Sequence, residues 1–196
     1  MKKINWEFWF TLAAILFPMI LISATFANAE ELTSADKLLI EESVYDLYLA
    51  TINCDPKDVT RVTNLKPEHY DYLVEGTWWE GNGKALMVLE QKYGINAIFA
   101  MAVSSLESGY GSSSKAKRCH NYYGLMINRT WESLYHNTSY WGSLMSTKYI
   151  GNGKYSVASI AIKYCPVNTS KWVRDITKLM RKFHKALLMK LEATRI

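Results

Sequence analysis

The stretch SSLESGYG, residues 104–111, closes an apolar run and carries a single acidic side chain, Glu107. Upstream of it, apolar residues recur at the i, i+3, i+4 spacing of a buried helix: Ile98, Phe99, Ala102 and Leu106. Gly109 supplies a typical helix end. The pattern therefore predicts a buried helix over residues 96–108, with Glu107 in its last turn.

A carboxyl group in that place has an unusual environment. The aligned backbone dipoles leave partial negative charge at the end of a helix, so they disfavour ionisation of Glu107, and burial acts in the same direction. A protonated carboxylic acid is what a general acid needs to protonate the leaving oxygen of a glycosidic bond. Gly109 and Gly111 would let the backbone turn sharply and approach a ligand. The plainer alternative is an exposed helix-end residue followed by a glycine cap.

Helical patterns also flank this central element. The predicted helices run from a cap at 33–36 to Tyr48, from Pro67 to Leu73, from Lys84 to Tyr93, from Ser156 to Cys165, and from a cap at Ser170 to Leu191. Residues 53–66 resemble a loop. Residues 112–153 are rich in Ser, Asn, Gly, Tyr and Trp with little apolar periodicity, which favours loops or a short hairpin lining a cleft. The predicted fold class is mainly α.

The N-terminal segment reads as a secretory signal. Two lysines precede an apolar stretch, and Ala27-Asn28-Ala29 follows as a signal peptidase site. An uncleaved membrane anchor is the alternative, because the apolar stretch has nearly the length that spans a bilayer. We divide the chain into a signal at 1–29, a helical extension at 30–72 and a catalytic domain at 73–196. We therefore expect a secreted or cell-wall-associated protein, or one anchored to the membrane.

The net charge indicates which partners the protein could bind, and the cysteine count limits the disulfides that it could form. The formal charge is +5, with most of the excess after Lys163, which suits an anionic cell wall or membrane surface. Nucleic acid is disfavoured, because no zinc-finger, basic-zipper or aromatic RNA-binding pattern accompanies the charge. The three cysteines allow at most one disulfide in an exported chain, and position favours Cys119 with Cys165.

Two motifs carry a resemblance to a known family. The segment YGINAIFAMAVSSLESGYGSSSKAKRCHNYYGLM, residues 93–126, resembles the core of glycoside hydrolase family 73 glucosaminidases. Their signature is an apolar helix ending in A-L-E-[ST]-G-[WY]-G-x-S, followed by N-N-L-F-G-I. Here the two parts stand as LESGYGSS at 106–113 and NYYGL at 121–125. The resemblance extends over about residues 73–183.

The resemblance implies a lysozyme-like fold that hydrolyses the β-1,4 bond after N-acetylglucosamine in peptidoglycan glycan strands. Glu107 matches the general acid of the family. Tyr110, Tyr123 and Gly124 match positions of the cleft floor, where aromatic faces suit sugar rings. Asn121 matches a motif Asn that either donates to a substrate acetamide or holds the loop.

The second catalytic group is less certain, because the chain departs from the family pattern between residues 128 and 154. Glu132 is the only acid between Glu107 and Asp175, and so the only downstream candidate for a base that activates water. Without it, the acetamide of the substrate could attack the anomeric carbon. Tyr149 or Tyr155 could then stabilise the charged transition state.

Other chemistry fits the sequence less well. Adjacent Cys119 and His120 cannot by themselves form the oriented arrangement of a thiol hydrolase. The four histidines lack the spacing of a zinc site, so neither a metal nor another cofactor is expected. A lytic transglycosylase, which also uses one helix-end glutamate, and a non-catalytic wall-binding or assembly component remain as alternatives.

Overall fold

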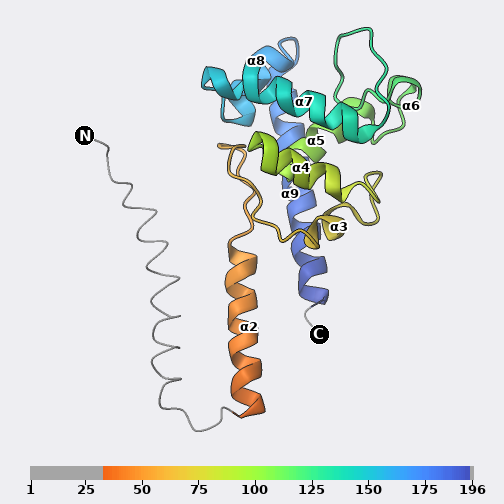
Figure 1. The fold of residues 1–196 in the computed structure, drawn as a ribbon. Helices are drawn as coiled ribbons and strands as arrows, with labels where there is room; N and C mark the ends of the chain where they lie inside the picture. The colour runs from red at the N-terminus through yellow and green to blue at the C-terminus, as the bar shows by residue number, and fades with distance from the viewer. Residues whose placement is uncertain (1–32, 195–196) are drawn as a thin grey trace. The chain divides into compact units, whose positions relative to one another are not determined.

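The structure is a computed structural model that describes residues 33–194 (Figure 1). Its contacts divide the chain into two compact units, one up to Leu47 and one from Tyr48 onward. The predicted signal at 1–29 lies outside the described residues. Within 33–194, none of the helices has the length and apolar content needed to cross a bilayer.

Helix α2, Ser34–Ala50, begins at the predicted cap. The Thr33 backbone N–H and hydroxyl donate to the Asp36 carboxylate at 3.1 and 2.6 Å, and the Asp36 N–H donates back to Thr33 Oγ1 at 3.2 Å. This reciprocal pairing satisfies N–H groups that a helix start leaves without partners. The helix predicted from the cap is confirmed. Its exposed apolar side chains are Leu38, Leu39, Val44 and Leu47.

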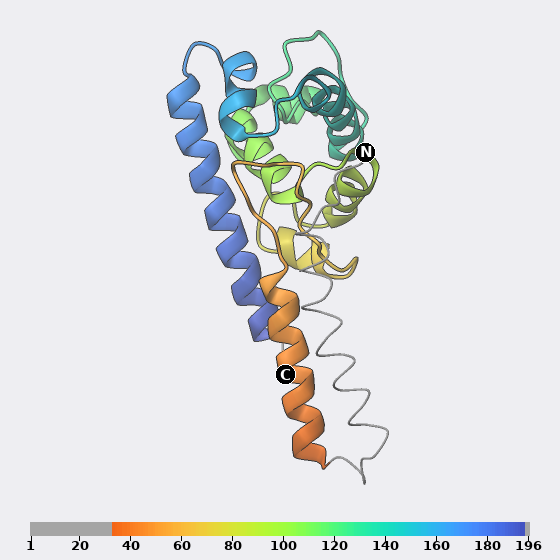
Figure 2. The same cartoon turned by 90° about the vertical axis from the view of Figure 1, so that its left-hand side faces the viewer.

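The second unit is mainly helical, and the predicted fold class is confirmed (Figures 1 and 2). Its elements are α3 His69–Val74, α4 Gly83–Tyr93, α5 Ala97–Ser108, α6 Ser114–Cys119, α7 Leu134–Lys148, the 3-10 turn η1 Ile150–Asn152, α8 Val157–Tyr164 and α9 Thr169–Ala193. Helix α4 contacts α3, α5 and α7, while α9 contacts α3, α5 and α8.

Helix α5 is the central element, as the apolar spacing predicted. All side chains from Ala97 to Ser105 are buried, and so is Ser108. The Asn96 side chain caps the helix start by accepting from the Phe99 N–H at 3.0 Å. Gly109 ends the helix in the left-handed conformation, with φ +56°. Glu107 therefore lies in the last turn of a helix that the rest of the unit surrounds.

Helix α9 runs along one side of the unit (Figure 2). Its buried side chains follow a helical stripe: Trp172, Ile176, Leu179, Met180, Phe183, Leu187 and Leu191. Basic side chains occupy much of its exposed face. The helix begins at Thr169, and the side chain of its N-cap, Asn168, makes no capping bond, so the predicted Ser170 cap is not used.

Residues 112–153 differ from the loops or hairpin that we expected. Helices α6 and α7 occupy much of this region, and the stretch between them, 120–133, is irregular. The buried side of α7 includes Asn137, Thr138 and Gly142 at helical spacing, so hydrophobicity does not reveal it. A Cβ on Gly142 would lie 2.5 Å from Leu89 and 2.6 Å from Tyr93, which means that α4 and α7 approach too closely for a side chain.

The segment 51–66 is tied to the helices by hydrogen bonds. The Asn96 side chain donates to the carbonyls of Asn53 and Arg61 at 3.0 and 2.8 Å. The buried Glu90 carboxylate accepts from the Thr63 N–H and hydroxyl at 2.9 and 2.8 Å. It also accepts from the Ala97 N–H at 2.6 Å. This irregular segment thus supports the start of α5.

All three cysteines are free thiols, so the expected Cys119–Cys165 disulfide is absent from the structure. Cys119 closes α6, whereas Cys165 lies at the end of α8. The Cys54 thiol donates to the Met180 carbonyl at 3.6 Å, and burial raises its pKa to about 12. A thiol with that pKa is a poor nucleophile.

Candidate active site

The Glu107 carboxyl is partly buried and is held by one hydrogen bond. The indole N–H of Trp172, near the start of α9, donates to Glu107 Oε1 at 2.8 Å. Burial raises the pKa of Glu107, and the Trp172 bond opposes this shift because it stabilises the charged form. The sequence predicted a raised pKa from the helix dipole together with burial, and burial is the largest cause.

Gly124 forms a wall beside the same carboxyl group. It adopts φ +64°, and a Cβ built there would lie 2.5 Å from Glu107 Oε2 and 3.2 Å from its Cδ. Only glycine leaves room for Glu107 at this distance. The second motif, NYYGL, thus lies against the first in space.

The turn that follows α5 is held in a conformation that most side chains avoid. Gly109, Tyr110 and Gly111 have successive φ values of +56°, +55° and +73°. Tyr110 is not glycine, and non-glycine residues in this region are uncommon and concentrate at functional sites. The Tyr110 N–H donates to the Ser105 carbonyl at 2.8 Å. Its side chain remains 50% exposed, so it is available to a ligand.

The serines before Glu107 anchor two tryptophans that the sequence analysis overlooked. Ser105 Oγ accepts from the Trp78 indole at 2.9 Å, and Ser104 Oγ accepts from the Trp79 indole at 3.0 Å. Trp78 also stacks on Tyr122, with ring centroids 5.1 Å apart. The sequence contains two adjacent serines and, about 25 residues earlier, two adjacent tryptophans. Nothing in the sequence alone indicates that each serine bonds one of these tryptophans.

Tyr164, at the end of α8, is a further residue of the site that sequence reasoning missed. Its ring packs against Trp172, with centroids 5.3 Å apart. Its hydroxyl donates to the Tyr123 carbonyl at 2.5 Å and accepts from the Trp141 indole at 3.2 Å. Burial and the nearby charge of Glu107 raise the pKa of Tyr164 well above its usual value, so the phenol stays neutral.

Asn121 and Tyr123 occupy the interior beside this site. The buried Asn121 side chain donates to the Leu125 carbonyl at 2.8 Å and accepts from the Leu125 N–H at 3.0 Å. It thus holds the loop that carries Gly124. The fully buried Tyr123 ring stacks on Trp141 at 4.4 Å. A sugar therefore has no access to the Tyr123 face in this conformation.

The three residues considered for the second catalytic role, Glu132, Tyr149 and Tyr155, lie in different surroundings. Glu132 precedes α7, its side chain is 85% exposed, and it pairs with His136 at 3.5 Å. Tyr149 is buried beside Tyr164, at a centroid distance of 5.9 Å. Tyr155 is 50% exposed, and its carbonyl accepts from the Val59 N–H at 2.8 Å. Within residues 33–194, no cluster of three His, Cys, Asp or Glu side chains could hold a metal ion.

Comparison with known proteins places this geometry in a family. The family model Glucosaminidase, described as mannosyl-glycoprotein endo-beta-N-acetylglucosaminidase, matches residues 83–185, which is more than half of the chain. The chain belongs to the glucosaminidase family. The predicted resemblance to glycoside hydrolase family 73 is therefore confirmed.

Related glucosaminidases provide two further comparisons. Proteins named as endo-beta-N-acetylglucosaminidases in Streptococcus pneumoniae strains TIGR4 and R6 are each 34% identical over 74 residues, or 35% of this chain. The chain aligns with only 11% and 10% of their lengths.

Solved structures of S. aureus autolysin E share the fold. A catalytic mutant in complex with the disaccharide NAG-NAM aligns with a TM-score of 0.58 and 18% identity, over 68% of this chain and 72% of that one. A complex with the muropeptide NAM-L-Ala-D-iGlu aligns at 0.56 and 19%, over 73% and 77%. The predicted lysozyme-like class is confirmed by this likeness.

Proposed function

We propose that this protein hydrolyses the β-1,4 bond after N-acetylglucosamine in bacterial peptidoglycan, with Glu107 as the general acid. The observation that carries the proposal is the partly buried Glu107 carboxyl, which Trp172 orients and whose pKa is raised. Membership of the glucosaminidase family supports the reaction class. The fold likeness to autolysin E, which binds NAG-NAM in one structure, supports the substrate class.

The proton donor acts first in this mechanism. Neutral Glu107 gives its proton to the glycosidic oxygen as the bond to the anomeric carbon breaks. Gly124 and Trp172 fix the carboxyl from two sides, so little reorganisation is needed when charge develops. The leaving sugar departs with a neutral hydroxyl, and Glu107 is left as a carboxylate.

The nucleophile is the second part of the proposal. Glu132 is largely exposed and paired with His136, which gives it little of the shielding that tunes a catalytic carboxylate. We therefore favour attack by the substrate acetamide oxygen on the anomeric carbon, which forms an oxazolinium ring. Water then opens this ring and returns a proton to Glu107. Tyr164, whose pKa is raised by burial and by the charge of Glu107, is the neutral phenol that we assign to the site in place of Tyr149 or Tyr155.

The proposed setting is the bacterial cell wall, reached by secretion or from the membrane. The expected partners are peptidoglycan glycan strands, and the excess of basic residues on α9 would favour an anionic wall or membrane surface.

Mass spectrometry of released peptidoglycan fragments tests the reaction. The full chain should release fragments with reducing N-acetylglucosamine ends, and Glu107→Gln should release at least about 1,000-fold less, because an amide is far too weak an acid to protonate the leaving oxygen. Circular dichroism of both proteins checks that the variant is folded. Equal release by the two proteins would contradict a role for Glu107 as the acid.

A lytic transglycosylase is the second candidate, favoured by the raised pKa of the partly buried Glu107 and by the exposure of Glu132. Such an enzyme would use Glu107 but release anhydro-muramic ends. The same mass spectra therefore distinguish the two reactions, and absence of any release would favour a wall-binding role.

A further inference from the structure

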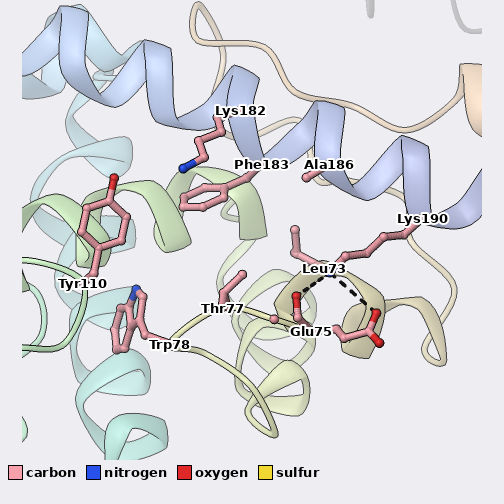
Figure 3. Close-up of a pocket in the computed structure, with 10 residues that line it drawn as sticks. Leu73, Glu75, Thr77, Trp78, Tyr110, Lys182, Phe183, Ala186 and Lys190 are labelled. Carbon is pink, nitrogen blue, oxygen red and sulfur yellow. Dashed lines mark hydrogen bonds and ion pairs between the residues drawn. The ribbon is translucent and has the colours of Figure 1, made fainter.

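A pocket of about 450 Å³ lies beside the turn that follows Glu107 (Figure 3). It lies between α9 and the segment that links α3 to α4. Its lining is largely apolar or aromatic and includes Leu73, Trp78, Tyr110, Phe183 and Ala186, together with Lys182, Lys190 and Glu75.

The charges of this pocket are unevenly distributed. Lys190 is engaged, because it pairs with Glu75 at 3.7 Å and donates to the Tyr72 carbonyl at 3.0 Å. Lys182 is exposed, and no carboxylate within residues 33–194 lies at ion-pairing distance from it. Its amine points toward the Tyr110 end of the pocket (Figure 3). The pocket thus combines an apolar floor with a cation that is available to a ligand.

The pocket adjoins the end of α5 and the turn that follows Glu107. Trp78, which lines it, is hydrogen-bonded to Ser105 of α5, and a Cβ on Gly111 would touch its ring at 2.7 Å. Helix α9 connects the two places as well. Phe183 follows Trp172 by three helical turns on the same buried face, which separates them by roughly 16 Å along the axis.

We propose that this pocket binds the stem peptide of the peptidoglycan strand whose sugars lie at Glu107, with Lys182 pairing with a peptide carboxylate. The inference rests on the proposed function. The muropeptide bound by autolysin E illustrates the chemistry of such a stem, since L-Ala carries a methyl group and D-iGlu a carboxylate. A methyl group suits Phe183 and Ala186, and a carboxylate suits Lys182.

The reach of the substrate agrees with this assignment. An extended chain covers about 3.3–3.6 Å per residue, so a stem of two or three residues spans about 7–11 Å. The sugar that carries it adds several ångströms more. A strand whose sugar contacts Glu107 can therefore place its peptide in the pocket near Lys182 and Phe183.

Two substrates distinguish contacts with the stem peptide from contacts with the glycan. One is peptidoglycan with its stem peptides, and the other is the same glycan freed of peptides by an amidase. In the full chain, Lys182→Glu should lower kcat/KM about tenfold on the first substrate and less than about twofold on the second. The control Lys178→Glu makes the same charge change one turn earlier on α9, at an exposed site outside the pocket, and should change neither by more than about twofold.

A second variant tests the pocket without changing its charge. Ala186→Trp should fill the space above Phe183 and reduce kcat/KM only on the peptide-bearing substrate. Equal losses on both substrates for either variant, or no loss on either, would overturn the proposal. Equal losses in Lys182→Glu and Lys178→Glu would also overturn it, because they would indicate a general effect of charge. Failure of the proposed function is distinct, since the unaltered chain would then release no fragments from either substrate.

Discussion

Glu107 experiences two opposing influences on its ionisation, and one of them can be removed alone. Burial raises the pKa of its carboxyl, while the Trp172 indole donates to the charged form and lowers it. The proposed general acid is active only while protonated, so activity should be lost as pH rises through the pKa of Glu107.

Trp172→Phe should shift this loss of activity, the alkaline limb of the pH profile, to higher pH. Phenylalanine keeps an aromatic ring but cannot donate to the carboxylate, so the pKa of Glu107 should increase. The pH profile of kcat/KM measures the shift. Trp131→Phe is the matched control, because the Trp131 indole N–H is buried without an acceptor among the described residues. A limb that stays in place, or an equal shift in both variants, would contradict the assignment.

Gly124→Ala should remove most activity while leaving the fold intact. The new Cβ would displace the Glu107 carboxyl, which lies 2.5 Å from its built position, so kcat should fall by about 100-fold or more. Gly153→Ala provides the control, since Gly153 also has a positive φ, +76°, but has nothing within 4 Å of a built Cβ. Similar kcat losses in both variants would indicate backbone strain instead of displacement of the acid.

Single residues of the site were only partly predictable. Glu107 could be located because its helix has strong apolar periodicity and a glycine end. Trp172 and Tyr164 could not be found in this way. Trp172 lies 65 residues from Glu107 in the sequence. Tyr164 packs on Trp172, so the place of both residues depends on how α8 and α9 pack. The role of Asn121 could not be chosen from sequence, because the same side-chain amide could either donate to a substrate acetamide or hold the loop, as it does here.

At the scale of elements, prediction succeeded where burial is apolar and failed where it is polar. Helix α5 was found because its buried side is rich in aliphatic residues. Helix α7 was missed because Asn137, Thr138 and Gly142 occupy its buried side. Gly142 in particular reads as a loop signal, although here it permits the close approach of α4.

Asn96 controls the start of α5, and Asn96→Ala should weaken it. The change removes a helix cap worth about 1 kcal/mol and two bonds to the carbonyls of Asn53 and Arg61, each worth about 1 kcal/mol. We expect the free energy of unfolding to fall by about 2–3 kcal/mol in urea titrations.

Asn82→Ala is the control for this change. Asn82 precedes α4, and its side chain makes no capping bond, so the loss should be below about 0.5 kcal/mol. Equal losses in the two variants would show that the bonds of Asn96 contribute nothing particular to stability.

At the scale of the whole molecule, the segment before α4 has a structural part that the sequence did not reveal. The buried Glu90 carboxylate receives bonds from Thr63 and from the Tyr70 hydroxyl, at 2.5 Å for the latter. Our expected catalytic domain, 73–196, would lack both partners. Glu90 would keep its bond from the Ala97 N–H but lose the bonds from Thr63 and Tyr70. Loss of partners by a buried charge typically costs about 3–5 kcal/mol.

Two truncations test this dependence. A chain that begins at Tyr48 should melt cooperatively in circular dichroism and retain its activity, because it keeps the whole second unit. A chain that begins at Leu73 should have a Tm lower by about 10 °C or more, or fail to fold. Identical melting of the two chains would contradict a structural role for residues 48–72.

The bond between Trp172 and Glu107 also gives the protein an internal optical probe. An indole that donates to a carboxyl group changes its fluorescence when that group gains or loses a proton. The emission difference between the unaltered chain and Trp172→Phe would isolate this one indole from the other six tryptophans. The ionisation of the proposed acid could then be followed in the resting protein, without any substrate.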